Sequence, residues 1–100
     1  MSSSQTLDVP GYQVISYLGS GARSTIWQIR NCQSDQTFAL KRVVRRQSSD
    51  SRFLEQAENE FEVGSQLDHP AIRHIYDIRR VKRWLTLREI HLVMEMCEEI

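Results

Sequence analysis

The chain has 100 residues, 40% of them apolar and 26% charged, and its 13 basic and 13 acidic residues give a formal net charge of zero. This composition is ordinary for one small globular domain or part of a larger one, and it argues against wholesale disorder. Zero net charge provides no overall attraction to nucleic acid or acidic membranes, so neither is expected as a partner of this segment. A run of about 18 apolar residues that could span a bilayer is also missing from the sequence.

The cysteines and the N-terminal residues carry no signal for metal binding or secretion. Cys32 and Cys97 are far apart, form no Cys-X-X-Cys motif and lack histidine partners at zinc spacing. We therefore expect two reduced thiols in a cytoplasmic protein. The start of the chain lacks the basic and apolar regions of a secretory signal. We predict a flexible N-terminal tail over residues 1–10, loose over 1–9, and one domain over residues 11–100, entered at Pro10-Gly11.

Strand-like segments and short polar turns dominate both ends of the predicted domain, with one helical segment between them. The predicted elements are, in chain order, strands at 12–18, 25–30 and 37–44, a helix at about 51–67 that Asp50 or Ser51 caps, and strands at about 72–80 and 89–96, with a long basic hairpin between these last two. The sequence therefore predicts an α+β fold, in which one helix packs on a five-stranded antiparallel sheet.

A glycine-rich segment, Gly19-Ser20-Gly21-Ala22-Arg23-Ser24, joins the first two predicted strands. Glycines allow backbone N–H groups to approach phosphate oxygens closely, although the same residues also suit a tight hairpin turn. A dinucleotide-binding loop of the Rossmann type would open into a helix, and a Walker loop would end in Gly-Lys-Ser/Thr. Here the segment continues into strand residues. The remaining nucleotide interpretation is a glycine loop between antiparallel strands.

Two charged residues stand among apolar ones. Lys41 lies on the third predicted strand, where its amine must reach solvent or an anion. At about 100° per residue, Glu60 falls within the apolar face of the helix, with Phe53, Ala57 and Phe61, whereas Glu55, Glu58 and Glu62 fall on the opposite, solvent face. A carboxylate facing a core is costly unless a cation pairs with it, so we expect Lys41 to pair with Glu60. Glu60 reaching solvent at the edge of this face is the alternative.

In sequence order, these motifs resemble those of the eukaryotic-like protein kinase family. The segment from Leu18 to Ile26 is similar to the glycine-rich loop of that family, and Phe38-Ala39-Leu40-Lys41 is similar to its Val-Ala-Ile-Lys motif. Glu60 precedes Leu67-Asp68-His69-Pro70 at the spacing that kinases use between the helix glutamate and the His-Pro turn. The segment Leu92–Cys97 resembles the fifth strand running into the hinge. The resemblance covers residues 11–100 and implies a kinase N-lobe.

The resemblance implies a role for each matched residue. Lys41 and Glu60 would be the catalytic pair that orients the α- and β-phosphates of ATP. The other ATP-binding residues would be Leu18, Gly19, Ser20, Gly21, Ser24, Ile26, Ala39, Met94 as gatekeeper, and the backbone groups of Glu95 and Cys97. The parent protein would transfer the γ-phosphoryl group of ATP to a protein hydroxyl, of serine or threonine. The sequence ends before the His-Arg-Asp and Asp-Phe-Gly motifs, so Mg²⁺ and the protein substrate would bind through the missing C-lobe, and this segment alone would be inactive.

Two departures from the family pattern leave alternatives open. Ser24 replaces the third glycine of the loop, which costs some backbone freedom. Gly64 stands where kinases carry a large apolar side chain, which leaves a gap that Tyr76 or Phe61 would have to fill. A pseudokinase, a kinase-like scaffold without phosphoryl transfer, and a free-standing interaction module are therefore alternatives to an active kinase.

Basic residues crowd the connection between the last two predicted strands. Arg79, Arg80, Lys82, Arg83 and Arg88 surround Trp84 and Leu85. Such a cluster is most often a solvated hairpin, although it also suits an acidic surface on another domain, or nucleic acid or phospholipid. Zero net charge argues against a dedicated nucleic-acid-binding protein.

Overall fold

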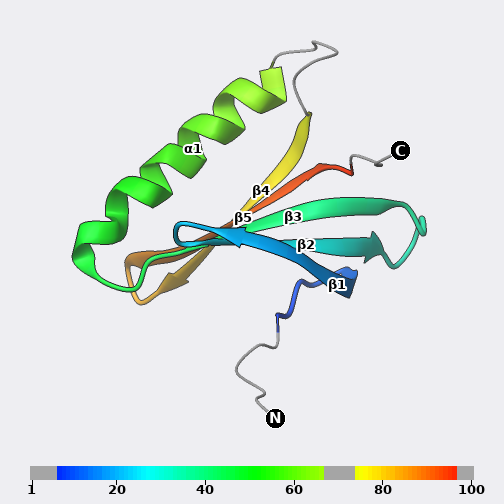
Figure 1. Cartoon of the computed structure of the whole chain (residues 1–100), viewed down its shortest axis with the longest axis horizontal. Helices are drawn as coiled ribbons and strands as arrows, with labels where there is room; N and C mark the ends of the chain where they lie inside the picture. Colours follow the sequence, from blue (N-terminus) through cyan, green and yellow to red (C-terminus); the bar gives the residue numbers. More distant parts are fainter. Residues whose placement is uncertain (1–6, 67–73, 97–100) are drawn as a thin grey trace.

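The computed structural model describes residues 7–66 and 74–96, with the backbone alone for residues 64–66. Its elements are strands β1 (Tyr12–Gly21), β2 (Ser24–Asn31) and β3 (Thr37–Val44), the 3₁₀ turn η2 (Ser48–Asp50), helix α1 (Ser51–Gln66), and strands β4 (Ile75–Arg83) and β5 (Thr86–Glu95). The strands form one antiparallel sheet in the order β1-β2-β3-β5-β4. Helix α1 crosses one face of this sheet (Figure 1). The predicted α+β fold is confirmed.

The strands extend further than predicted at the β1–β2 and β4–β5 hairpins. The glycine-rich segment is part of the β1–β2 ladder, with Gly19 opposite Ile26 and Gly21 opposite Ser24, so only Ala22 and Arg23 form the turn. Between β4 and β5 the ladder continues to the pair of Arg83 and Thr86. A two-residue turn therefore replaces the predicted long connection. The predicted Asp68-His69-Pro70 turn lies outside the described residues.

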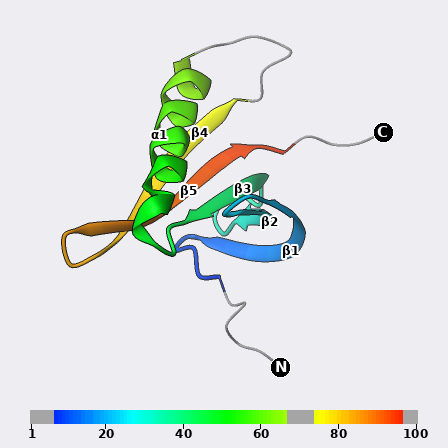
Figure 2. The ribbon, with the colours of Figure 1, turned by 60° about the vertical axis from the view of Figure 1, so that its left-hand side comes forward.

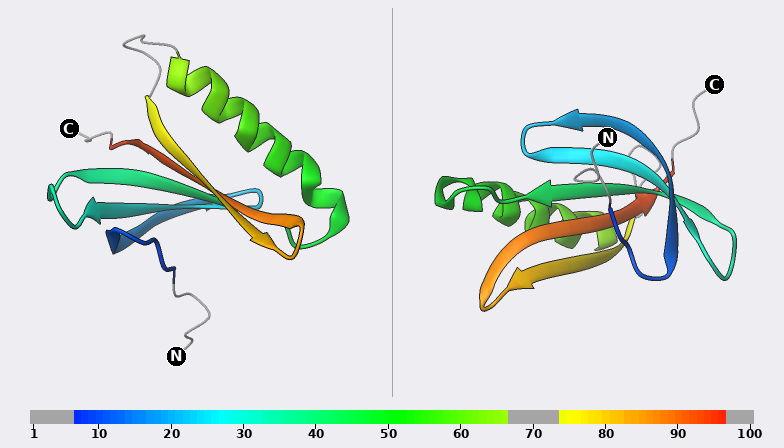
Figure 3. Two further views of the ribbon diagram at one scale, coloured as in Figure 1. Left: turned by 180° about the vertical axis from the view of Figure 1, so that it is seen from behind. Right: turned by 90° about the horizontal axis from the view of Figure 1, so that it is seen from below.

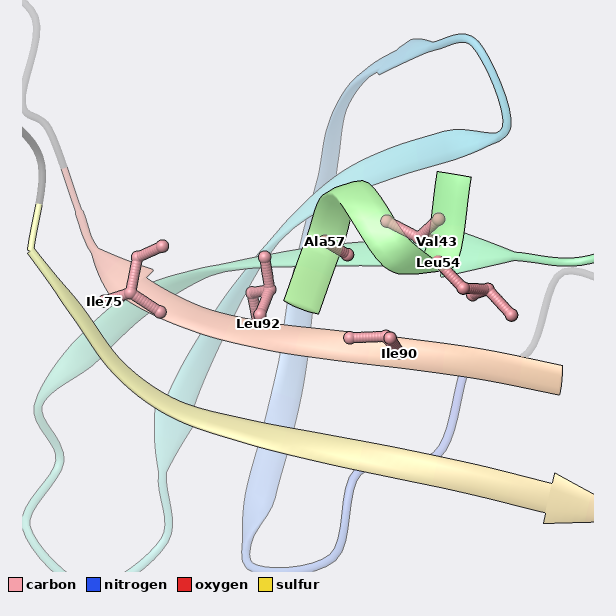
Figure 4. Packing of buried hydrophobic residues seen from close by; sticks show 6 residues of the cluster. All are labelled: Val43, Leu54, Ala57, Ile75, Ile90 and Leu92. Atoms are coloured by element: carbon pink, nitrogen blue, oxygen red, sulfur yellow. The ribbon is translucent and has the colours of Figure 1, made fainter. Parts of the chain in front are cut away.

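The main core lies between α1 and the sheet (Figure 4). Because side chains alternate along a strand, one face of β3, β4 and β5 contributes apolar residues to this core. The six buried residues of the cluster come from β3, α1, β4 and β5: Val43, Leu54, Ala57, Ile75, Ile90 and Leu92. Phe61 packs against this cluster and Tyr76 does not; instead, the Tyr76 ring packs edge-on against Phe38, with 5.5 Å between centroids.

A second core lies on the opposite face of the sheet and includes the N-terminal segment. Val9 is 4% exposed and is buried with Ile29, Leu40 and Val93, and Leu7 packs against the same cluster. The N–H of Tyr12 donates to the carbonyl of Val9 at 3.0 Å. The prediction of a loose tail over residues 1–9 is therefore wrong for Leu7 to Val9. This segment follows a serine-rich stretch, but its two apolar residues, Leu7 and Val9, cover the face of the sheet opposite helix α1 (Figure 3).

In the described part of the chain, no helix has the length and apolar character needed to cross a bilayer.

Val9 offers a direct test of this second core. Changing Val9 to Ala removes two buried methyl groups, so we expect a loss of about 1–2 kcal/mol in the free energy of unfolding, measured by urea denaturation. The matched change Val63→Ala, at a helix position that is 53% exposed, should alter stability by less than about 0.5 kcal/mol. Equal losses in both variants would contradict the burial of Val9.

Candidate functional site

The register of the sheet brings the predicted site residues into two neighbouring rows. Ile26 is the cross-strand partner of Lys41, and Lys41 is that of Leu92. In the next row, Ala39 lies between Gln28 and Met94. Cross-strand partners point to the same face of a sheet. The rows therefore place an amine beside a mainly apolar surface, on the face that also carries α1.

The predicted ion pair is present. The Nζ of Lys41 donates to the Oε1 of Glu60 at 2.9 Å, and this contact joins β3 to α1. The two side chains are 27% and 38% exposed. The apolar face of α1 packs on the sheet through Leu54 and Ala57, and this packing holds Glu60 over β3. Lys41 thus has an anionic partner on one side and still reaches solvent on the other.

A cavity of about 150 Å³ connects this ion pair with the tip of the glycine-rich hairpin. Ala22 lines it from the turn, Lys41 and Val43 from β3, and Ala57 and Glu60 from α1. A Cβ added at Gly19 would meet no atom within 4 Å, so the space beside this backbone is open. The three motifs recognised in the sequence therefore border one solvent-accessible space, which suits an anionic group beside the amine of Lys41.

Asp50 anchors the hairpin tip to the loop before α1, a contact that the sequence did not reveal. Its Oδ2 accepts from the Nε of Arg23 at 2.9 Å and from the backbone N–H groups of Arg46 and Gln47 at 3.1 and 3.2 Å. Asp50 therefore organises the β3–α1 connection and does not cap the first turn of α1. Arg23 has a φ of 58°, in the left-handed region. The ion pair of Arg23 with Asp50 fixes the position of the turn.

The pKa of Asp50 is lowered by this arrangement. Burial by itself would raise the pKa of the carboxyl group, but the hydrogen bonds from Arg46, Arg23 and Gln47 favour the ionised form and outweigh it. A charged Asp50 is therefore the form in which the turn is held.

A second charged network lies on the opposite face of the sheet. Arg42 donates two hydrogen bonds of 2.9 Å to the carboxylate of Glu89, and the Nε2 of His91 lies 2.9 Å from the same carboxylate. His91 is buried at 2% exposure. Burial lowers its pKa, and the charges of Arg79 and Arg42 lower it further, against the raising effect of Glu89. For Glu89, burial would raise the pKa, but Arg42 and His91 bring it below its usual value.

Helical periodicity did not predict that Glu58 has a partner on the sheet. The periodicity placed it on the solvent face of α1, yet it accepts two hydrogen bonds from Arg80 of β4, at 2.6 and 2.7 Å. These hydrogen bonds lower the pKa of Glu58. The pair connects the helix to the edge strand, and a long arginine side chain provides the reach.

The remaining predicted residues lie at the borders of the site. Leu18 is 47% exposed, at an irregularity of the β1–β2 register. Ser20 and Ser24 lie in the hairpin ladder, and Met94 packs partly buried against the helix-side core. Glu95 ends β5, where its N–H donates to the carbonyl of His74 at 2.9 Å. Cys97 lies outside the described residues.

Two further features bear on catalysis. Helix α1 continues through Gly64 to Gln66, so the glycine does not end the helix. Within residues 7–66 and 74–96, there is no cluster of three or more His, Cys, Asp or Glu side chains that could hold a metal ion.

Comparison with known proteins extends the match beyond single motifs. The family model described as protein kinase domain matches residues 12–100. Mouse "Cyclin-dependent kinase-like 4" is 31% identical over 88 residues, which is 87% of this chain and 24% of the mouse protein. "Serine/threonine-protein kinase ATG1" of Debaryomyces hansenii is 27% identical over 86% of this chain and 9% of the yeast protein. The chain thus spans a quarter or less of these curated relatives.

The buried histidine makes stability depend on pH in a defined direction. Because the pKa of folded His91 lies below its ordinary value of 6.5, the unfolded chain takes up a proton that the folded chain does not. Stability should therefore fall as the pH drops below about 6.5, with a slope of at most about 1.4 kcal/mol per pH unit. Urea unfolding between about pH 7.5 and 5.5 should show that His91→Gln reduces this slope. An unchanged slope in His91→Gln would refute the assignment.

Proposed function

This chain belongs to the protein kinase family, and from that premise we propose that residues 11–100 bind ATP as the N-lobe of a serine/threonine kinase. The observation that carries the proposal is the Lys41–Glu60 ion pair at 2.9 Å, set at the edge of a cavity that the glycine-rich hairpin also borders. In kinases, this lysine–glutamate ion pair must be in place, together with a bound Mg²⁺, for phosphoryl transfer. The serine/threonine preference rests on the name of the yeast relative.

The described residues fit a nucleotide by their chemistry. Lys41 would hold the α- and β-phosphates, with its amine fixed by Glu60, while the backbone of Gly19, Ser20, Gly21 and the nearby Ser24 would approach them from above. Leu18 and Ile26 would cover the adenine ring from one side. Ala39 and Met94 would line its pocket, and the backbone of Glu95 and Cys97 would bind its polar edge.

Phosphoryl transfer would need groups that the described residues do not supply. Those residues hold no metal-binding cluster, so we propose that Mg²⁺ is bound by a C-lobe, which would also carry the catalytic base and the protein substrate. This segment should accordingly bind ATP weakly and transfer no phosphoryl group. The affinity of this segment for ATP therefore tests the proposed binding site, and the kinase activity of the parent protein tests the proposed phosphoryl transfer.

A lysine substitution tests the site directly. Lys41→Met keeps an unbranched, mainly apolar side chain but removes the amine and its charge, so we expect at least a tenfold loss of Mg-ATP affinity, measured by calorimetry on the 100-residue chain. The matched control Lys82→Met, at an exposed position of β4, should bind as the unchanged protein does. Equal affinity of Lys41→Met and the unchanged chain would overturn the assignment.

The same substitution separates a kinase from a scaffold. In the parent protein, Lys41→Met should abolish transfer from ATP to serine or threonine peptides. A parent protein that binds its partners but shows no Lys41-dependent phosphoryl transfer would favour the pseudokinase alternative. Gly64 is the sequence feature that supports this alternative.

A further inference from the structure

The β4–β5 hairpin carries an apolar tip that nothing in the described chain covers. Trp84 is 91% exposed and Leu85 is 95% exposed, whereas the other exposed large apolar side chains among the described residues are 41–53% exposed. In Figure 2 the hairpin, drawn in orange, extends beyond the other elements. Full exposure of an aromatic and an aliphatic side chain is costly in water. Two such residues at one projecting tip therefore indicate a surface that becomes covered.

The residue type at the tip is also unfavourable for the backbone conformation that it adopts. Trp84 has a φ of 63°, a left-handed conformation that glycine and asparagine adopt easily and that is rare for a bulky residue. Strained residues of this kind concentrate at functional positions. A turn selected for stability would carry Asn or Gly here. The aromatic side chain at this position therefore opposes the preference of the backbone.

A basic collar surrounds the base of the tip. Arg45, Arg83 and Arg88, with Trp84 and Thr86, line a cavity of about 480 Å³. Among the described residues, none of these three arginines forms an ion pair, whereas Arg42 and Arg80 each have a glutamate partner. The Nε of Arg45 is buried and has no hydrogen-bond acceptor. A buried donor without a partner indicates a missing acceptor, and guanidinium groups around a cavity suit a phosphate.

From this combination we propose that the β4–β5 tip binds the surface of an anionic phospholipid membrane. Trp84 and Leu85 would enter the interfacial region, which tryptophan favours, and the arginine collar would bind headgroup phosphates. A projecting apolar tip beside a cavity lined by guanidinium groups suits a broad anionic surface with an apolar interior, which an anionic bilayer offers. The contact is peripheral, so it needs no membrane span. The proposal also revises the expectation, based on zero net charge, that this segment has no membrane partner. Binding would depend on the local positive charge of the arginine collar and not on the net charge of the chain.

Vesicle co-sedimentation with the 100-residue chain tests the proposal. The chain should bind phosphatidylserine-containing vesicles and not pure phosphatidylcholine vesicles, and added salt should weaken the binding. Trp84→Ser and Leu85→Ser should each reduce binding strongly, whereas the matched change Ile15→Ser, at a strand position that is 41% exposed, should not. Trp84 fluorescence should shift to shorter wavelength on binding.

The collar has its own matched control. Arg45→Gln and Arg88→Gln should each lower affinity for the anionic vesicles roughly fivefold. Arg30→Gln, at the far end of the sheet opposite Thr37, should leave it within about twofold, and circular dichroism should show that all variants remain folded. Failure of the unchanged chain to bind, or equal binding by Leu85→Ser and Ile15→Ser, would overturn the proposal. Binding of an acidic peptide that requires Arg45 but not Trp84 or Leu85 would also overturn it, in favour of a protein partner.

Discussion

The ion pair between Lys41 and Glu60 joins helix α1 to strand β3, and the candidate site depends on the orientation that this contact gives to the lysine amine. Partly exposed ion pairs of this kind contribute only about 0.2–1 kcal/mol to stability. The packing of Leu54 and Ala57 on the sheet is worth several times more. The pair is therefore too weak to explain the docking of the helix, and its value lies in the orientation that it gives to the lysine amine. That is the arrangement expected of a group that must meet a phosphate.

The two faces of the sheet have different roles: one borders the candidate site and the other is covered by the N-terminal segment. On the helix side, the alternation of β3 directs Ala39, Lys41 and Val43 toward α1 and the cavity. On the other side, Leu40 packs against Val9, and Arg42 pairs with Glu89. The N-terminal segment thus closes a face that would otherwise expose apolar side chains. Asp50 connects the hairpin tip to the β3–α1 loop, so that glycine-rich hairpin, strand and helix meet around one space.

The fold and the central pair of the site could be predicted because both depend on local periodicity. Lys41 was identified as a charge among the apolar residues of its predicted strand, and the 100° helical repeat placed Glu60 on the face of the helix that packs on the sheet. The contacts of Asp50 with Arg23 and of Arg42 with Glu89 join residues 27 and 47 positions apart, and no local pattern signals them. Val9 was missed because two apolar residues in a polar segment give no periodicity. Glu58 was assigned to solvent because periodicity ignores the length of an arginine on the neighbouring strand.

A double-mutant cycle on Mg-ATP affinity would test the central claim most directly. If Glu60 acts by orienting Lys41, Glu60→Gln should weaken binding in the unchanged chain but have almost no effect once Lys41 is methionine. Calorimetry on the two single variants and the double variant would give the coupling. Losses that simply add would contradict the account, because they would mean that Lys41 and Glu60 act on the nucleotide independently.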